Sequence, residues 1–343
     1  MPGFLLFGRD LTVFAQAFDL SKGQLTGDAF AIAEAAGSGL TLNLHSASES
    51  GVLGYRTGRF ESKQFTWYDR GGKRLGSIGD ARDYWQFPVS PDNRRLAAQV
   101  RESGRNYHWQ LDLAGGIVSR LTSGQSEDTA AWSPDGSEII FGSRAGADRT
   151  DLFRKVVGGG EEHLLFSSNQ PKFPKQWLRD GSLLFINTAG KSLYRLPLRK
   201  DASPEVLLKT EYSKDTPRVS PDGRWISYSA DESGRWEVYV ASYPSFQQRR
   251  QVSNNGGVQG AWRKDGKELH YLTLDGMLMA VAVKPGPPLE TGIPQTLFPT
   301  RIPVTPTFDQ YAVFDDGRKF LLIESVETQA PQITVVLNAL AGR

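Results

Sequence analysis

A four-residue segment that recurs along the whole chain constrains the fold more than any other feature. Ser-Pro-Asp-Gly stands at 133–136 and 220–223, and Ser-Pro-Asp-Asn at 90–93 is a near copy. Looser copies share the same frame, so that the final residue of the segment falls at positions 51, 93, 136, 181, 223, 266 and 317. These anchors follow one another at intervals of 42 to 51 residues. Such regular spacing predicts a repeat protein, in which each copy is one supersecondary unit.

The residues of the segment are those of a tight turn. Proline presets φ at the second turn position, aspartate accepts hydrogen bonds from the nearby backbone, and glycine adopts the positive φ that other residues resist. Asn93 replaces glycine in one copy, and asparagine is among the residues that tolerate this conformation best. We therefore interpret the segment as a hairpin corner, and its aspartates as turn residues rather than catalytic ones.

Short apolar runs surround each corner and define the repeating unit. An apolar residue stands four positions before each anchor: Ala47, Val89, Trp132, Trp177, Val219, Trp262 and Val313. A β-rich run such as 139–141 follows the anchor, and two further runs, such as 151–157 and 162–166, complete the unit. Each unit thus holds four short strands. Four-stranded units of this length, repeated about seven times, predict an all-β protein with the fold of a β-propeller.

The number of blades depends on how the two ends of the chain are used. Residues 1–34 supply an incomplete first repeat and residues 308–343 an incomplete last one. Because propellers often close by completing one blade from both ends, we expect a single propeller over 1–343 with seven or eight blades. The alternative is a six-bladed ring from about residue 74 to the end, closed by the strand at 74–78, with the remnant of another propeller before it.

Composition excludes several kinds of partner and cofactor. The formal net charge is +2, which gives no strong basic field to attract nucleic acid. Cysteine is absent, and the histidines are scattered at 45, 108, 163 and 270, so we expect no metal site and no cofactor. No apolar stretch approaches the ~18 residues of a membrane-spanning helix, so we expect no direct membrane insertion.

Several stretches outside the corners carry a resemblance to a known group of proteins. They are 3–10 (Gly-Phe-Leu-Leu-Phe-Gly-Arg-Asp) with 14–19 and 25–27, then 65–76 (Phe-Thr-Trp-Tyr-Asp-Arg-Gly-Gly-Lys-Arg-Leu-Gly), and 333–338 (Ile-Thr-Val-Val-Leu-Asn). The corners resemble those of TolB-like, WD-repeat-like propellers. The stretches are similar to the C-terminal sensor-like region of membrane-tethered bacterial serine/threonine kinases. This resemblance implies a propeller that is part of a larger signalling protein and lies outside the cytoplasm, in the periplasm or at the cell surface.

The resemblance also implies that the sequence belongs to a longer product. In those kinases, a kinase domain, a membrane helix and more propeller precede the segment that matches 3–19. We expect no kinase activity from these residues themselves, because they lack a Gly-rich loop before a β3 lysine, a His-Arg-Asp catalytic loop and an Asp-Phe-Gly segment. The Gly-x-Ser-x-Gly segment of serine hydrolases is absent as well.

The candidate binding residues follow from topology rather than from a motif. In a propeller, the loops that lead into the innermost strands surround one mouth of the central channel. Those loops carry the residues that we predict to contact a ligand: Tyr84, Trp85, Asp128, Lys172, Asp215, Gln259 and Asp309. Aromatic side chains supply contact area and charges supply orientation, a combination that suits a protein or peptide. The alternative for Tyr84, Trp85 and Phe173 is that they fill the channel as a plug.

Two classes of function remain. The first is a non-catalytic binding or sensing propeller, a monomer whose partner is a protein, a peptide or a component of the cell envelope. The second is a propeller enzyme, a lyase or a glycan hydrolase, that uses carboxylates at the channel mouth, where Glu127 and Asp128 precede an innermost strand. An enzyme needs convergent carboxylates with perturbed pKa values in a deep pocket. Because no catalytic motif accompanies these residues, we predict the binding module.

Overall fold

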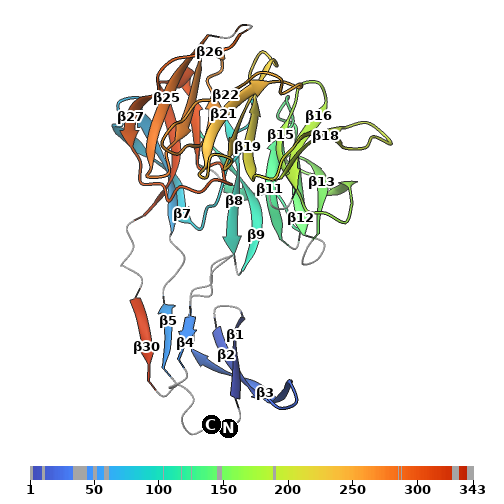
Figure 1. The fold of residues 1–343 in the computed structure, drawn as a ribbon, viewed down its shortest axis with the longest axis vertical. Helices are drawn as coiled ribbons and strands as arrows, with labels where there is room; N and C mark the ends of the chain where they lie inside the picture. Colours follow the sequence, from blue (N-terminus) through green and yellow to red (C-terminus); the bar gives the residue numbers. More distant parts are fainter. Residues whose placement is uncertain are drawn as a thin grey trace. The chain divides into compact units, whose positions relative to one another are not determined.

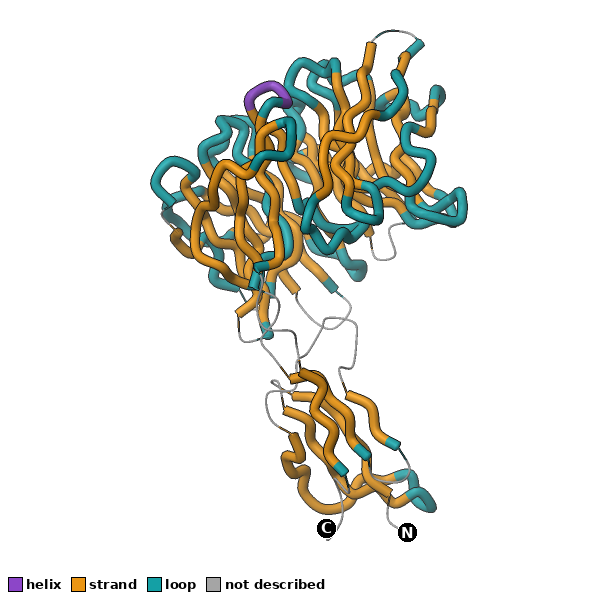
Figure 2. Tube along the Cα trace, turned by 90° about the vertical axis from the view of Figure 1, so that its left-hand side faces the viewer, coloured by secondary structure: helices purple, strands orange, loops and turns teal. Residues whose placement is uncertain are grey.

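The computed structural model describes residues 3–9, 12–33, 45–48, 52–57, 62–102, 104–116, 118–124, 126–144, 149–187, 191–284, 286, 288–326 and 332–337. Strands dominate these residues, and the one helical turn among them is the 3-10 turn Asp315–Gly317 (Figures 1 and 2). The chain divides into two compact units. The propeller unit is Lys63–Ser325, and the terminal unit combines Met1–Ser62 with Val326–Arg343. We expected a single propeller over 1–343, and the structure groups the chain into these two units.

Six antiparallel sheets form the propeller unit (Figure 1). Sheet 1 contains β8 (Arg95–Glu102), β9 (Arg105–Asp112) and β10 (Val118–Arg120). Sheet 2 contains β11 (Glu127–Trp132), β12 (Glu138–Arg144), β13 (Thr150–Val156) and β14 (His163–Phe166). Sheet 3 contains β15 (Lys172–Trp177), β16 (Ser182–Asn187), β17 (Ser192–Pro197) and β18 (Glu205–Lys209). In sheet 1 the segment 84–89 takes the innermost place, because Tyr84 and Val89 bridge to Val100 and Leu96 of β8.

Sheets 4 and 5 continue the same order from an innermost to an outermost strand. Sheet 4 contains β19 (Lys214–Val219), β20 (Trp225–Ala230), β21 (Glu237–Ser242) and β22 (Arg249–Gln251). Sheet 5 contains β23 (Val258–Trp262), β24 (Glu268–Leu272), β25 (Met277–Lys284), β26 (Glu290–Thr291) and β27 (Gln295–Pro299). In sheet 5 both β26 and β27 pair with β25. The strands β19 to β22 and the strands β23 to β25 pair antiparallel with their neighbours in the sequence, as the spacing of the repeats predicts.

Sheet 6 closes the unit with strands from two distant parts of the chain. Its inner strands are β28 (Tyr311–Phe314) and β29 (Lys319–Ser325), and its outer strands are β6 (Lys63–Asp69) and β7 (Arg74–Arg82). The β29–β6 ladder is in register from Lys319 opposite Asp69 to Ser325 opposite Lys63. The last repeat is thus completed by residues 63–82 and not by residues 1–34. The propeller unit consequently holds six sheets, where the sequence predicts seven or eight blades or, as the alternative, a six-bladed ring from about residue 74 to the end of the chain.

Apolar clusters between neighbouring sheets show that the six sheets form a closed ring. Phe65, Leu96 and Leu321 join sheet 6 to sheet 1. Five further clusters join sheets 1 and 2, 2 and 3, 3 and 4, 4 and 5, and 5 and 6. Because sheets 2 to 5 each lie between two neighbours, their central strands bury both faces, and β20 is buried along its whole length. This burial explains the continuous apolar runs after the corners.

The corner turns confirm the turn chemistry predicted from the sequence. Six anchors have positive φ values: Asn93 (58°), Gly136 (71°), Gly181 (76°), Gly223 (73°), Gly266 (71°) and Gly317 (80°). In the second sheet, the Gly136 N–H donates to the Ser133 carbonyl oxygen over 2.9 Å. The Ser133 hydroxyl donates to Asp135 over 2.6 Å and accepts from the Glu138 N–H over 2.9 Å. The anchor at residue 51 lies outside the described residues.

The terminal unit contains two three-stranded sheets. They consist of β1 (Gly3–Arg9), β2 (Thr12–Asp19) and β3 (Gln24–Ala33); and of β4 (His45–Ala47), β5 (Leu53–Thr57) and β30 (Gln332–Val336). A small apolar cluster of Val13, Ala33 and Leu53 joins the two sheets. Within the expected incomplete first repeat, the described residues 3–9 and 12–33 form a sheet of their own, and of the strands near the C-terminus β28 and β29 belong to sheet 6 and β30 to this unit. No helix among the described residues is long and apolar enough to cross a membrane.

Candidate functional site

The candidate site lies where the chain leads into the innermost strand of each sheet, and we call this side of the ring the channel mouth. In four of these strands a register shift separates the first one to three residues from the regular ladder, at 127/130, 174/176, 215/218 and 258/261. Such bulges redirect side chains locally. They explain why polar residues that interrupt the apolar pattern can gather around the channel.

A buried ion pair joins sheets 3 and 4 at the channel mouth. The Lys175 Nζ atom lies 2.6 Å from Asp215 Oδ1, and both side chains are almost completely buried. Burial raises the pKa of Asp215, while Lys175 and a 2.5 Å hydrogen bond from the Thr216 N–H oppose that rise. Lys175 also donates to the Thr307 carbonyl oxygen over 3.3 Å. Thr307 precedes sheet 6, so Lys175 links three sheets.

Two further carboxylates at the mouth are each held by an arginine. Asp128 is 8 % exposed, accepts from the Thr150 hydroxyl over 3.2 Å, and lies 3.6 Å from the Arg144 guanidinium. Burial raises the pKa of Asp128, and the positive charge of Arg144 lowers it. Asp309 is half-buried and pairs with Arg218 of sheet 4. Asp128, Asp215 and Asp309 thus lie in the predicted region, each with a cationic partner.

Gln259 forms a reciprocal amide pair that joins sheet 5 to sheet 6. Its Nε2 donates to Gln310 Oε1 over 2.9 Å, and its Oε1 accepts from the Gln310 N–H over 2.8 Å. The same Nε2 donates to the Thr305 carbonyl oxygen over 2.7 Å. Gln259 has a φ of 61° and is 2 % exposed. The structure therefore places Gln259 at the mouth but uses its side chain to hold the loop before β28.

Trp85 is half-buried at the channel mouth. Its ring meets the ring of Phe308 edge-on, with 5.4 Å between centroids. The Lys63 ammonium lies over the Trp85 ring at 4.9 Å from the centroid and donates to the Tyr84 carbonyl oxygen over 3.1 Å. Aromatic pairs and cation–π contacts of this kind stabilise exposed rings by about 0.5–1.5 kcal/mol each.

Tyr84 and Lys172 do not face the channel mouth with free side chains. Tyr84 is 1 % exposed, packs on Phe65 at 4.5 Å between centroids, and donates its hydroxyl to the Asp80 carbonyl oxygen. Lys172 is also 1 % exposed, and its ammonium donates to the Ser168 and Gln170 carbonyl oxygens. Tyr84 therefore belongs to the core between sheets 6 and 1, and Lys172 fixes the loop before β15. We leave both out of the proposed site.

Sequence reasoning missed two cationic partners of the predicted residues. Lys175 and Arg218 stand three or four positions inside their strands, whereas Phe308 stands beside Asp309 in a loop that was expected at the mouth. A charged residue within an otherwise buried innermost strand is the signal that could have found Lys175 and Arg218. The bulges hid this signal, because simple alternation does not hold across a register shift.

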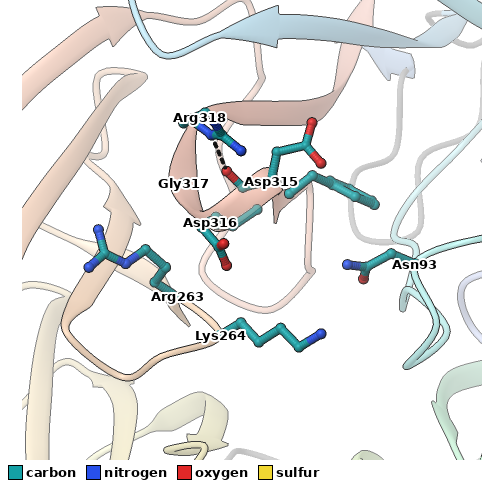
Figure 3. A pocket seen from close by; sticks show the side chains of 9 residues that line it. Asn93, Arg263, Lys264, Asp315, Asp316, Gly317 and Arg318 are labelled. Atoms are coloured by element: carbon teal, nitrogen blue, oxygen red, sulfur yellow. Dashed lines mark hydrogen bonds between the residues drawn. The ribbon is translucent and has the colours of Figure 1, made fainter.

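A pocket also exists on the opposite side of the ring, among the corner turns (Figure 3). Its volume is about 260 Å³, and it is lined by corner residues of sheets 5, 6 and 1: Asn93, Arg263, Lys264, Val313, Phe314, Asp315, Asp316, Gly317 and Arg318. The backbone of Asp315, Asp316 and Gly317 is left-handed, with φ values of 48°, 53° and 80°. The sequence analysis did not predict this pocket, because it treated the corners only as turns.

Among the described residues, no group of three or more histidine, cysteine, aspartate or glutamate side chains is placed to hold a metal ion.

These features define a six-sheet β-propeller with a polar channel mouth. The chain belongs to the TolB β-propeller domain family, whose model matches residues 85–266, more than half of the chain. No curated protein sequence gives a significant match.

Comparison with solved structures agrees with this family. The chain is similar to a TolB-type protein from Agrobacterium tumefaciens, with 16 % identity and a TM-score of 0.60 over 79 % of this chain and 100 % of that one. It is also similar to TolB from Acinetobacter baumannii, with 14 % identity and a TM-score of 0.53 over 96 % of this chain and 79 % of that one. An oligogalacturonate lyase in complex with manganese shows 15 % identity and a TM-score of 0.51, over 97 % and 85 % of the two chains. At these identities the likeness extends to the fold alone.

Proposed function

We propose that this protein is a non-catalytic binding propeller that holds a protein or peptide partner at its channel mouth. The observation that carries the proposal is the half-buried pair of Trp85 and Phe308 at the mouth, to which sheets 2, 3 and 4 also contribute ion pairs. Aromatic anchors surrounded by fixed charges are typical of protein interfaces, because the rings supply buried area and the charges select a register.

The state of the carboxylates favours binding over the alternative of a lyase or glycan hydrolase. Asp128, Asp215 and Asp309 each lie next to a cation that stabilises the ionised form. A general acid or base must exchange a proton with a reacting atom within about 3 Å. A carboxylate that is fixed in an ion pair is better suited to hold the wall of the channel than to transfer protons.

The setting of the propeller follows from its resemblance to kinase sensor regions. We propose that it forms part of a larger signalling protein, acts outside the cytoplasm as a monomer, and binds a component of the cell envelope. Fusing a periplasm-dependent reporter to the end of the propeller in the natural protein tests the location. If this reporter is inactive and a reporter that works only in the cytoplasm is active at the same fusion point, the proposed location is contradicted.

Site-specific photocrosslinking tests the binding surface. A benzoylphenylalanine residue is placed at Trp85 at the mouth, or at Arg224, which is an exposed corner residue and serves as the matched control. Each protein is irradiated with envelope extract, the crosslinked partner is identified, and its affinity is then measured with purified proteins. We expect the partner to crosslink at position 85 alone and to lose at least tenfold in affinity when Trp85 is replaced by alanine. Equal crosslinking at both positions, or an unchanged affinity, would contradict the proposal.

A further inference from the structure

The segment that leads from sheet 5 into sheet 6 has an unusual position at the channel mouth. This mouth loop, Pro303–Asp309, follows β27 and precedes β28 without forming a strand of its own. Pro303 and Pro306 lack the N–H group that a β-ladder needs. None of the seven residues is fully buried, although Val304 packs against the cluster between sheets 5 and 6.

Side chains from four other sheets hold the mouth loop. The Lys175 ammonium of sheet 3 donates to the Thr307 carbonyl oxygen, and the Gln259 amide of sheet 5 donates to the Thr305 carbonyl oxygen. Arg218 of sheet 4 pairs with Asp309, and Trp85 of sheet 1 meets Phe308. From sheet 6 itself, Gln310 donates to the Pro303 carbonyl oxygen and accepts from the Thr305 N–H.

The order of the sheets shows that the loop spans the channel. Sheets 3 and 6 lie on opposite sides of a closed ring of six sheets. A carbonyl oxygen that precedes sheet 6 nevertheless accepts a hydrogen bond from Lys175 of sheet 3. The loop must therefore reach over the centre of the mouth, where it bends at residues 306–308 and is bound through its carbonyl oxygens, one aromatic ring and one carboxylate.

The groups that receive the loop are fixed and buried, whereas the loop is not. Lys175 is 6 % exposed and Gln259 is 2 % exposed. If the loop left, their N–H groups would lose carbonyl acceptors in a place with little water, which costs free energy unless a ligand supplies new acceptors. The buried Trp85 Nε1 atom in addition makes no hydrogen bond within the described residues. The mouth is thus a preformed set of donors with one aromatic platform.

We propose that the mouth loop is an internal stand-in for the partner, which binds by displacing it. The partner is a peptide that follows the bent course of the loop, places an aromatic side chain on Trp85 and a following carboxylate on Arg218, and offers carbonyl oxygens to Lys175 and Gln259. This inference rests on the proposed function and names the chemistry of its ligand. The loop then sets a threshold for binding, because a peptide must compete with a tethered segment of similar chemistry.

A peptide with the sequence of the loop tests the proposal without any knowledge of the natural partner. The probe is a fluorescein-labelled peptide of residues 302–310 (Ile-Pro-Val-Thr-Pro-Thr-Phe-Asp-Gln), blocked at both ends, and its binding is followed by fluorescence anisotropy. The full chain is compared with a loop variant in which residues 304–309 are replaced by Gly-Ser-Gly-Ser-Gly-Ser. We expect the peptide to bind the loop variant at least tenfold more tightly than the parent chain. Adding Trp85→Ala to the loop variant should remove this gain.

Controls separate displacement from nonspecific binding and from misfolding. A second peptide, with alanine in place of the phenylalanine and asparagine in place of the aspartate, should bind the loop variant at least tenfold more weakly. If the loop variant does not show the circular dichroism and cooperative unfolding of the parent, the single substitution Phe308→Gly takes its place, with the same expected direction. Equal affinity of the first peptide for parent and variant, or equal affinity of both peptides, would overturn the inference. Failure here leaves crosslinking at Trp85 unaffected, so it is distinguishable from failure of the proposed function.

Discussion

The polar groups at the two ends of the innermost strands obtain their hydrogen-bond partners in different ways. At the corner end, each turn satisfies its own backbone through residues within the same six positions, as Ser133 does for Asp135 and Glu138. At the channel mouth, polar groups are satisfied across sheets, as when Lys175 of sheet 3 contacts Asp215 of sheet 4 and Thr307 before sheet 6. The corner end therefore relies mainly on hydrogen bonds within each turn, with a few contacts between sheets such as that from Arg95 to the Gly136 carbonyl oxygen, whereas the mouth relies mainly on contacts between sheets.

Breaking an inter-sheet ion pair at the mouth should have the largest effect. Asp215→Ala leaves the Lys175 ammonium buried without its partner, and such uncompensated charges cost about 3–5 kcal/mol. The free energy of unfolding from urea titration measures the loss. The double substitution Lys175→Met with Asp215→Leu is the control, because it removes both charges and should recover most of the stability. A loss below about 1 kcal/mol in the single variant would show that water reaches Lys175.

A buried carboxyl without a cation makes the mouth sensitive to pH. Glu127 begins β11, accepts from the Thr122 hydroxyl, and lies 3.9 Å from the ring of the buried His108. Burial raises the pKa of Glu127 from 4.5 to about 7, and Glu162 adds to this rise. Burial lowers the pKa of His108 from 6.5 to about 3. Both groups are therefore uncharged in the folded protein at about pH 6.

The two shifts affect stability in opposite directions. The contribution of Glu127 to the free energy of unfolding is complete below about pH 4.5 and is lost as the pH rises through 7. The contribution of His108 is complete above about pH 6.5 and is lost as the pH falls towards 3. The free energy of unfolding of Glu127→Gln minus that of the parent should therefore increase by up to about 3 kcal/mol when the buffer changes from mildly acidic to mildly alkaline. Urea titrations at both pH values measure this difference. A difference that does not change with pH would mean that Glu127 ionises freely in the folded chain.

At the corner end, a glycine-to-alanine substitution should change stability only through the backbone conformation of the substituted residue. Gly223 has a φ of 73°, and a Cβ atom there would meet no other atom within 4 Å. Gly223→Ala should thus cost about 1–2 kcal/mol through its left-handed backbone and not through a clash. Gly159 is the matched control, because a Cβ atom there also meets nothing and its φ is not in the left-handed region. Equal thermal stability of the two alanine variants would show that the corner tolerates a side chain.

The same contrast explains how much the sequence alone could predict. The corners repeat because every sheet needs the same turn, so Asn93 and Gly223 were visible as anchors and their φ values agree with that interpretation. The side chains at the mouth do not repeat, because each has a different partner in another sheet. Topology indicates that Asp128 and Asp215 stand near the start of innermost strands, but nothing local indicates that Lys175 lies between sheets or that Tyr84 packs inside the core.

The smallest expected effect concerns a hydrogen bond that joins neighbouring sheets at the corner end. The Trp262 Nε1–H donates to the Arg218 carbonyl oxygen over 2.9 Å, just as Trp132 donates to the Pro88 carbonyl oxygen over 3.0 Å. Trp262→Phe keeps most of the apolar contact and removes this bond, so it should cost about 1 kcal/mol. Trp177→Phe is the control, because the Trp177 indole donates to no described residue. Equal losses in urea titration would assign the cost to ring size, whereas a larger loss at Trp262 would show that the corner end also depends on a contact between sheets.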